Sequence, residues 1–207
     1  MAAALYNPLE KQNLARSIEA ELLSRDVTPL DMLEPFSGAG VYVIYYSGPF
    51  ALYAPLVKAN AESWTHPIYV GKAIPKGGRK GGMTQDAQLA GPAVYSRLRK
   101  HAESIKATSN LEILHFTFRW IELDDIWIPL GENILIETFK PLWNIALDGF
   151  GINDPGKGRL NQKRSAWDIL HPGRAYASRL KGVDQNSESI IRRVGDYFNR
   201  HQPDHKD

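Results

Sequence analysis

The chain has 207 residues, of which 43% are hydrophobic, enough to bury a conventional core in one domain with extensions. It has no cysteine, which excludes disulfides, thiol catalysis and zinc sites built on thiolates. The formal net charge is only +2, so a nucleic-acid partner would have to be bound by locally concentrated basic residues. Neither a signal peptide nor an apolar run of the ~20 residues that span a membrane is present, so we expect a cytoplasmic protein without a membrane partner.

The first predicted elements are a helix and two strands. Residues 9–25 carry apolar side chains at helical spacing and predict an amphipathic helix, within an extension that covers residues 1–37. Residues 41–46 are rich in β-branched and aromatic side chains and predict a strand, and residues 68–70 predict a second, short one. Residues 50–66 between them are interpreted as a loop or a short helical insert.

The second half of the chain adds a strand between helices. Helical spacing recurs over residues 93–107 and 187–200, and residues 130–140 predict a helix that the following proline ends. Apolar and polar side chains alternate over much of residues 111–123, which predicts a long strand. The order of elements predicts an α+β fold with a small antiparallel or mixed three-stranded sheet flanked by helices.

Two short tyrosine-glycine strings lie in the two predicted strands, Gly40-Val41-Tyr42 and Tyr69-Val70-Gly71, with twenty-six residues between the tyrosines. A phenol with a pKa near ~10 is a poor base by itself, but a neighbouring cation helps it to lose or share its proton. The alternative is that Tyr42 and Tyr69 are packing residues, since the chain has nine tyrosines. Lys72 follows the second string directly and could neutralise charge at the same place.

Arg97 and His101 are four residues apart in a predicted helix, so their side chains project from one face. A guanidinium can bind a phosphate through two hydrogen bonds, and an imidazole can accept a proton or hold a tyrosine hydroxyl. The alternative is an ordinary basic turn of a surface helix. Taken alone, these two residues favour the ordinary surface turn.

Glu132 shares one face of its predicted helix with Ile136 and Phe139. A carboxylate on a half-buried face is costly unless it is paired or binds a metal ion. The alternative is an acid of the first turn that interacts with the helix dipole. Asn144 lies twelve residues further on and, taken alone, is best interpreted as a turn residue after Pro141.

These residues, taken in order, resemble the catalytic core of the GIY-YIG nuclease superfamily over residues 38–146, with valine in place of isoleucine in both strings. The resemblance implies hydrolysis of DNA phosphodiesters with one Mg²⁺ or Mn²⁺ ion held by Glu132, leaving 5′-phosphate and 3′-hydroxyl ends. It implies that Tyr42 activates water with help from Lys72 or His101, and that Arg97 and Tyr69 steady the phosphate. It also implies that Asn144 belongs to the site.

The compact chain resembles the type II restriction endonucleases of this superfamily, which must read a DNA site with their own loops. A basic loop over residues 72–83 and the region 147–207 offer side chains that could contact base edges or phosphates. The alternative for both is solvated surface. The candidates for DNA contact are Lys76, Arg79, Lys80, Lys157, Arg159, Asn161, Gln162, Lys163, Arg164 and His171.

The resemblance implies a short palindromic site, by analogy G/C-rich, which would require a homodimer with twofold symmetry. The apolar stripes on the helices at 9–25 and 187–200 make these helices candidates for the dimer interface. Two other classes stay open. One is a structure-specific repair or recombination nuclease with the same centre, and the other is a non-enzymatic DNA-binding module with a decayed core.

Overall fold

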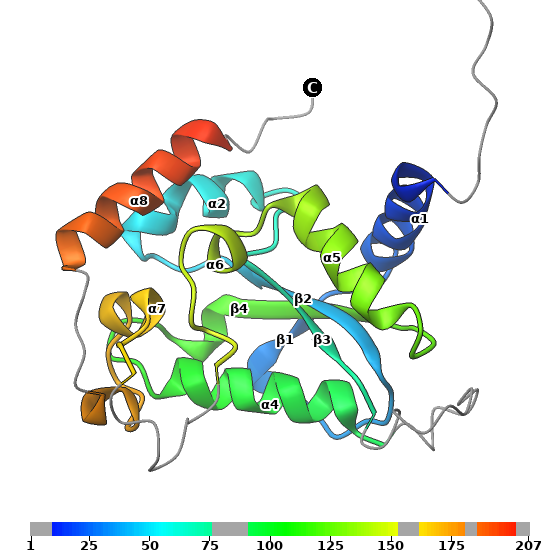
Figure 1. The fold of residues 1–207 in the computed structure, drawn as a ribbon, viewed down its shortest axis with the longest axis horizontal. Coiled ribbons are helices and arrows are strands. Elements are labelled where there is room, and N and C mark those ends of the chain that lie inside the picture. The colour runs from blue at the N-terminus through cyan, green and yellow to red at the C-terminus, as the bar shows by residue number, and fades with distance from the viewer. Residues whose placement is uncertain (1–9, 76–90, 153–161, 181–185, 202–207) are drawn as a thin grey trace, which may run out of the picture.

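The computed structural model describes residues 10–75, 91–152, 162–180 and 186–201 (Figure 1). Within these ranges the strands form one four-stranded sheet in the order β1-β4-β2-β3, and every neighbouring pair is antiparallel. The strands are β1 (Thr28–Pro29), β2 (Gly40–Tyr46), β3 (Tyr69–Ala73) and β4 (Phe116–Glu122). The central pair, β2 and β4, is in register from Gly40 opposite Glu122 to Tyr46 opposite Phe116.

The predicted α+β class is confirmed, but the predicted three strands are one too few. The additional strand, β1, has only two residues, and Thr28 and Pro29 pair with Phe118 and Thr117 of β4. A two-residue strand has no alternation that a sequence pattern could detect. Pro29 is tolerated there because β1 lies at the edge of the sheet, where a missing N–H need not break a ladder.

The helices follow the predicted ones closely, and α8 matches its prediction to the residue. The longer helices are α1 (Lys11–Leu23), α4 (Ala93–Lys106), α5 (Ile128–Phe139) and α8 (Ser187–Arg200). The short helical elements are η1 (Leu30–Met32), η2 (Ala51–Tyr53), α2 (Ala54–Ala59), η4 (Ile113–His115), α6 (Leu142–Ile145), α7 (Ala166–Leu170) and η6 (Ala177–Arg179). None of the helices within the described residues combines the length and the apolar character that crossing a bilayer requires.

Several predicted boundaries differ from the structure, two of them for clear physical reasons. The strand predicted from residue 111 begins at Phe116, because the 3₁₀ turn η4 precedes it and leaves Leu114 exposed. Helix α5 begins at Ile128, two residues before its prediction, since Pro129 occupies the first turn, where a missing N–H is harmless. Its end matches the expectation: Lys140 takes a left-handed conformation with a φ of 47°, and Pro141 follows.

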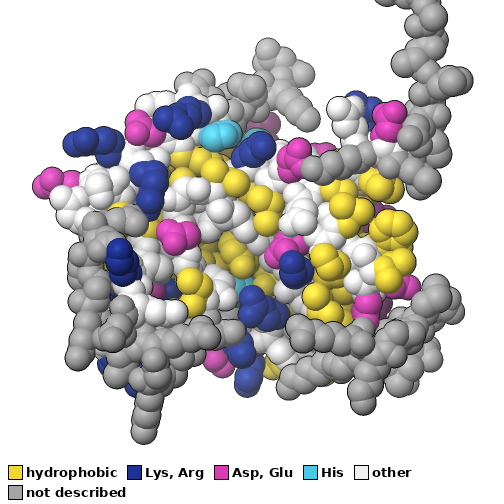
Figure 2. All heavy atoms as spheres, viewed as in Figure 1, with side chains coloured by type: hydrophobic (Ala, Val, Ile, Leu, Met, Phe, Trp, Pro, Cys, Tyr) yellow, Lys and Arg dark blue, Asp and Glu magenta, His cyan; other side chains and the backbone are white. Residues whose placement is uncertain are grey.

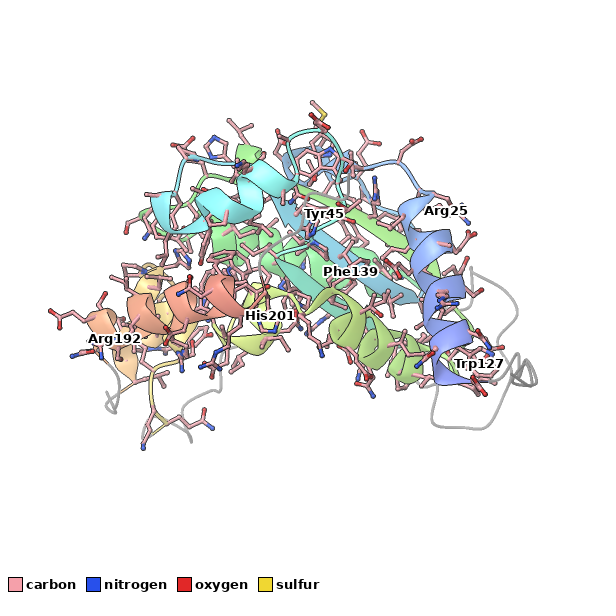
Figure 3. All side chains as sticks on the ribbon, turned by 90° about the horizontal axis from the view of Figure 1, so that it is seen from above. Arg25, Tyr45, Trp127, Phe139, Arg192 and His201 are labelled. Carbon is pink, nitrogen blue, oxygen red and sulfur yellow. The ribbon has the colours of Figure 1, made fainter. Side chains whose placement is uncertain are left out.

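Helices cover both faces of the sheet (Figure 1). On one face, α1 and α5 lie side by side and bury Val41, Val43 and Tyr45 of β2 (Figure 3). On the other face, α4, α6, α7 and α8 cover the opposite side chains of β2, including Tyr42. The side chains of one strand therefore enter two separate cores, as the twofold periodicity of a strand requires.

The apolar stripe on α8 and the C-terminal end of that on α1 are buried within the chain, while Leu14 and Ile18 of α1 are only partly buried, so these stripes give weaker support to a dimer interface than expected. On α8, Ile190, Val194, Tyr197 and Phe198 pack into the core that also holds Tyr42. On α1, Leu22 is fully buried against the opposite face of the sheet. The two helices lie on opposite sides of the molecule (Figure 3), each stabilised by its own contacts with the sheet layers.

Candidate active site

The candidate site residues gather around β3, which is an edge strand of the sheet. Helix α4 runs along one side of β3 and α5 along the other (Figure 1). Basic and acidic side chains lie side by side in the middle of the face on which β3 is seen (Figure 2). Because side chains alternate along a strand, Tyr69 and Lys72 of β3 point to opposite faces. The site thus lies at the edge of the sheet and includes side chains from both of its faces.

On the α4 face, the hydroxyl of Tyr42 and Nε2 of His101 are hydrogen-bonded at 2.7 Å, and both side chains are buried. Burial, followed by the charges of Arg97 and Arg174, lowers the pKa of His101 to about 3. Burial also raises the pKa of Tyr42 well above its ordinary value, with a further contribution from Tyr69 and an opposing one from Arg97. At neutral pH the pair is therefore an uncharged phenol beside an uncharged imidazole, sharing one hydrogen bond.

Arg97 brings positive charge to the two phenols. Burial raises the pKa of Tyr69, and the charge of Arg97 partly offsets that shift, as it does for Tyr42. Nε of Arg97 is buried and has no hydrogen-bond partner within the part of the chain that the structure describes. A buried donor without a partner is costly, and an anion bound at this place would relieve that cost.

On the α5 face, Nζ of Lys72 and Oε2 of Glu132 form an ion pair at 2.5 Å. The side chain of Glu132 is 17% exposed and that of Lys72 36%, so the pair lies at the surface of the site. Glu132 is the fifth residue of α5, beyond the first turn, so the helix-dipole interpretation does not account for it. Its charge adds to the burial that raises the pKa of Tyr69.

The described residues hold no group of three or more histidine or acidic side chains that could by itself enclose a metal ion. That is compatible with Mg²⁺, which keeps several waters and is commonly bound through one or two carboxylates together with substrate phosphates. Glu132 supplies one carboxylate that solvent can reach. The donor chemistry of the site therefore fits a hard divalent cation shared with a phosphate.

A comparison with family models identifies the protein family of the chain. The model described as the Eco29kI GIY-YIG domain matches residues 34–198. The chain belongs to this family. It is a GIY-YIG family of type II restriction endonucleases, so the chain is a nuclease domain and its substrate is DNA. A search of curated proteins gave no match.

The glycines of the two GIY-YIG strings are explained by close approaches. A Cβ on Gly40 would lie 2.0 Å from the carbonyl oxygen of Ile121, and Gly40 has a φ of +156°. A Cβ on Gly71 would lie 2.4 Å from the hydroxyl of Tyr42. The first glycine thus allows β2 to approach β4, and the second leaves room for the phenol of Tyr42 to lie across β3.

We expect Gly71→Ala to lower cleavage about 10²-fold, because the new methyl group displaces the Tyr42 hydroxyl from His101. Overpacking should also cost about 1–3 kcal/mol of unfolding free energy. Gly195→Ala on α8 is the matched control, since no described atom lies within 4 Å of its Cβ position. That control should keep full activity and gain up to ~1 kcal/mol. Cleavage rates and urea unfolding of both variants check this, and an active Gly71→Ala protein would contradict it.

Asn144 lies at the outer edge of β3. Its Oδ1 accepts a hydrogen bond from the N–H of Val70 at 2.8 Å, and its Nδ2 donates to the carbonyl of Val70 at 2.9 Å. Trp143 adds a backbone bond to the carbonyl of Ile68 at 2.9 Å. The amide of Asn144 thus pairs with the free edge of β3 and fixes the YIG string. Its expected part in the site stays a prediction.

Three site residues were missed by the sequence analysis: Phe150, Asp168 and Arg174. The ring of Phe150 stacks on His101 with centroids 4.5 Å apart and meets Tyr69 edge-on at 5.0 Å. Arg174 is buried and pairs with Asp168 at 2.7 Å. All three lie in a part of the chain without periodic pattern. A phenylalanine between Gly149 and Gly151 was the one local sign of a tightly placed ring.

The predicted DNA contacts fall into three groups. Lys76, Arg79, Lys80, Lys157, Arg159 and Asn161 lie outside the described residues. Gln162 and Lys163 are exposed, while Nε of Arg164 donates to the carbonyl of Ala177 at 3.1 Å. His171 is fully buried, so the expectation that it contacts DNA is wrong. Its Nε2 bonds the Tyr53 hydroxyl at 2.5 Å and its Nδ1 bonds Asn110 at 3.0 Å.

His101 and His171 should make the protein sensitive to acid. Burial lowers the pKa of both to about 3, whereas an unfolded histidine titrates near ~6.5. The unfolded state therefore binds more protons below pH ~6.5, and the unfolding free energy should fall as pH falls from there toward ~3. At pH ~5 each histidine should cost about 2 kcal/mol relative to neutral pH.

Thermal unfolding between pH 7.5 and 5 measures this effect. His171→Gln should reduce the acid-induced loss by roughly half, because one of the two buried imidazoles no longer titrates. His201→Gln serves as control, since that imidazole is partly exposed at the end of α8. Equal acid sensitivity of wild type and His171→Gln would contradict the assignment.

Proposed function

We propose that the protein is a type II restriction endonuclease that hydrolyses both strands of a short duplex site in a reaction that requires a divalent metal ion. The products would carry 5′-phosphate and 3′-hydroxyl ends. One observation carries the proposal: Tyr42, Tyr69, Arg97, His101 and Glu132, distant in sequence, converge around the edge strand of a GIY-YIG domain.

The Tyr42–His101 pair supports a proton relay. Tyr42 accepts a proton from the attacking water while it gives its own proton to Nε2 of His101, so that no buried tyrosinate accumulates. The high pKa of Tyr42 disfavours a free phenolate and makes a coupled transfer preferable. Binding of a phosphate beside Arg97 would offset one of the charges that lower the pKa of His101, and so favours the imidazolium that the relay forms. Of the two helpers expected for Tyr42, the geometry supports His101.

Arg97 and Tyr69 would hold the scissile phosphate. Among the described residues, Nε of Arg97 has no hydrogen-bond partner, and the charge of Arg97 adjoins both phenols. Guanidinium groups stabilise the additional negative charge of a pentavalent phosphate through charged hydrogen bonds. The hydroxyl of Tyr69 adds a neutral donor on the same side.

Glu132 would hold Mg²⁺ or Mn²⁺, which when bound supplies charge stabilisation for the phosphate and the leaving oxygen. The ammonium group of Lys72 is the present partner of that carboxylate. Lysine carries a compact charge on a flexible side chain, so Lys72 could leave Glu132 to the metal ion and move to the phosphate. Both side chains are partly exposed, which leaves room for this exchange at the surface of the site.

The proposed DNA-reading segments are attached directly to the site. Residues 76–90 connect β3 with α4, the two elements that carry Tyr69 and Arg97. Residues 153–161 begin two positions after Gly151, on which an added Cβ would lie 2.5 Å from the hydroxyl of Tyr69. Basic and amide side chains in these segments therefore belong to residues that are close in sequence to the proposed phosphate-binding groups. This position favours contacts with the bases or phosphates of the bound DNA.

A single centre cuts one strand at a time, so we further propose that two copies act on a palindromic, G/C-rich site. Sedimentation of the protein with and without a duplex that carries the mapped site tests this. A complex with two protomers is expected. A monomer on a duplex that is nevertheless cut on both strands would contradict it.

The proposed function is tested by incubating the protein with supercoiled plasmids of known sequence and Mg²⁺, with EDTA as control. Discrete linear fragments with ligatable ends at one common short sequence are expected. Preferential cutting of branched DNA would instead indicate a structure-specific nuclease. Binding without metal-dependent cleavage would indicate a DNA-binding module.

A further inference from the structure

Phe150 covers the proton relay from a segment that has no regular secondary structure. Its ring is nearly parallel to the His101 imidazole, with an interplanar angle of 19°, and perpendicular to Tyr69, at 82°. The segment contains Gly149 with a φ of +110°, and no strand ladder holds its backbone. The ring itself packs against Trp143 at 4.4 Å and Trp167 at 5.2 Å between centroids, but the backbone that carries it needs other contacts to hold its position.

The guanidinium of Arg174 binds that segment at three carbonyls. Nη2 donates to Gly149 at 2.9 Å, and Nη1 donates to Phe150 at 3.1 Å and to Ile152 at 3.3 Å. Nε donates to Asp168 at 2.7 Å. The planar guanidinium thus donates hydrogen bonds from Nε, Nη1 and Nη2 at the same time, which the single ammonium group of a lysine cannot do.

Arg174 is itself held rigidly. Its side chain is 3% exposed, and the Asp168 carboxylate that neutralises it also accepts a hydrogen bond from Ser165 at the start of α7. The guanidinium lies over the Trp167 ring at 4.5 Å from the centroid. A buried, charge-compensated and stacked arginine is a fixed anchor rather than a mobile surface group.

We propose that Arg174 is a positioning residue for DNA cleavage, because it fixes Phe150 over His101 and Tyr69 and so sets the geometry of the relay. The proposal rests on the proposed function, since it assigns Arg174 to the same reaction. Arg174 does not contact the reacting atoms: it acts through the backbone of residues 149–152 and through the Phe150 ring. Its charge also contributes to keeping His101 neutral.

The test compares Arg174→Lys with Phe150→Leu and wild type. Lysine keeps the charge beside Asp168 but cannot bind three carbonyls. For Arg174→Lys we expect kcat on the mapped plasmid site to fall about 10- to 100-fold while KM changes less than about threefold. We also expect its His101 ring protons, followed by NMR, to lose the ring-current shift of Phe150 and approach their positions in Phe150→Leu.

Arg119→Lys is the matched control. Arg119 also packs on a tyrosine ring, that of Tyr45, and binds a carbonyl, that of Trp64 at 2.9 Å, but on the opposite face of the sheet. It should leave both kcat and the His101 signals unchanged. If Arg174→Lys does not fold, the uncharged pair Asp168→Asn with Arg174→Gln replaces it, with the same expectations.

Wild-type His101 signals in the Arg174 variant would overturn the proposal, whether or not the rate falls. An unchanged rate together with shifted signals would overturn it as well. If the wild-type protein cuts no plasmid, the proposed function fails instead. The NMR comparison then still decides whether Arg174 positions Phe150, because it requires no cleavage.

Discussion

Glu132→Gln is expected to abolish cleavage, with a fall of at least about 10³-fold in the single-turnover rate, while specific DNA binding stays within about threefold. The change preserves the size of the side chain but removes the charge that would bind the metal ion. The Lys72–Glu132 pair is partly exposed, so its loss should cost at most about 1 kcal/mol of stability. Single-turnover cleavage with Mg²⁺, gel-shift binding in EDTA and urea unfolding measure the three quantities.

Glu137→Gln is the matched control for this variant, since it makes the same chemical change on the exposed side of the same helix. It should cleave at the wild-type rate. Cleavage by Glu132→Gln at a rate close to that of the control would remove the metal role from Glu132. Loss of DNA binding by Glu132→Gln would show that the carboxylate supports the DNA interface rather than the chemistry.

Tyr42→Phe should lower the rate of cleavage about 10²- to 10⁴-fold, the range typical for the loss of a general base. The change removes the hydroxyl that lies 2.7 Å from His101 and keeps the ring in its buried position on β2. One lost hydrogen bond should cost about 1 kcal/mol of unfolding free energy. The rate effect is thus far larger than any loss of folded protein could produce.

The chain contains its own control for this prediction, a second buried tyrosine–histidine pair. Tyr53 bonds Nε2 of His171 at 2.5 Å and also accepts from Trp143 at 3.0 Å. Tyr53→Phe therefore removes an equivalent hydroxyl outside the proposed nuclease centre and should lower stability but not the rate. Equal rate losses in the two variants would show that Tyr42 acts through packing, and a normal rate in Tyr42→Phe would assign the base to another group.

The core of the site could be predicted from the sequence because each of its parts is local. The two tyrosine-glycine strings lie on periodic strands, and Arg97 and His101 lie one helical turn apart. Such patterns need only the periods of strand and helix, and their order along the chain resembled the family to which it belongs.

The Phe150–Arg174 contact could not be predicted in this way. It joins residues twenty-four positions apart in a region without periodicity, and its partners are backbone carbonyls, which every residue has. His171 was predicted to contact DNA because a histidine among glycines and basic residues is expected to be exposed. Only the tertiary structure shows that it is buried and bonded to Tyr53 and Asn110.

The sequence by itself determined the α+β class, the strands and helices that carry the site, and the kinds of chemical group that meet there. Only the tertiary structure decided which groups touch. It paired Tyr42 with His101 and Lys72 with Glu132, because α4 and α5 cover opposite faces of β3. Periodicity shows on which face of its own element a residue lies, but packing between distant segments decides what that face meets.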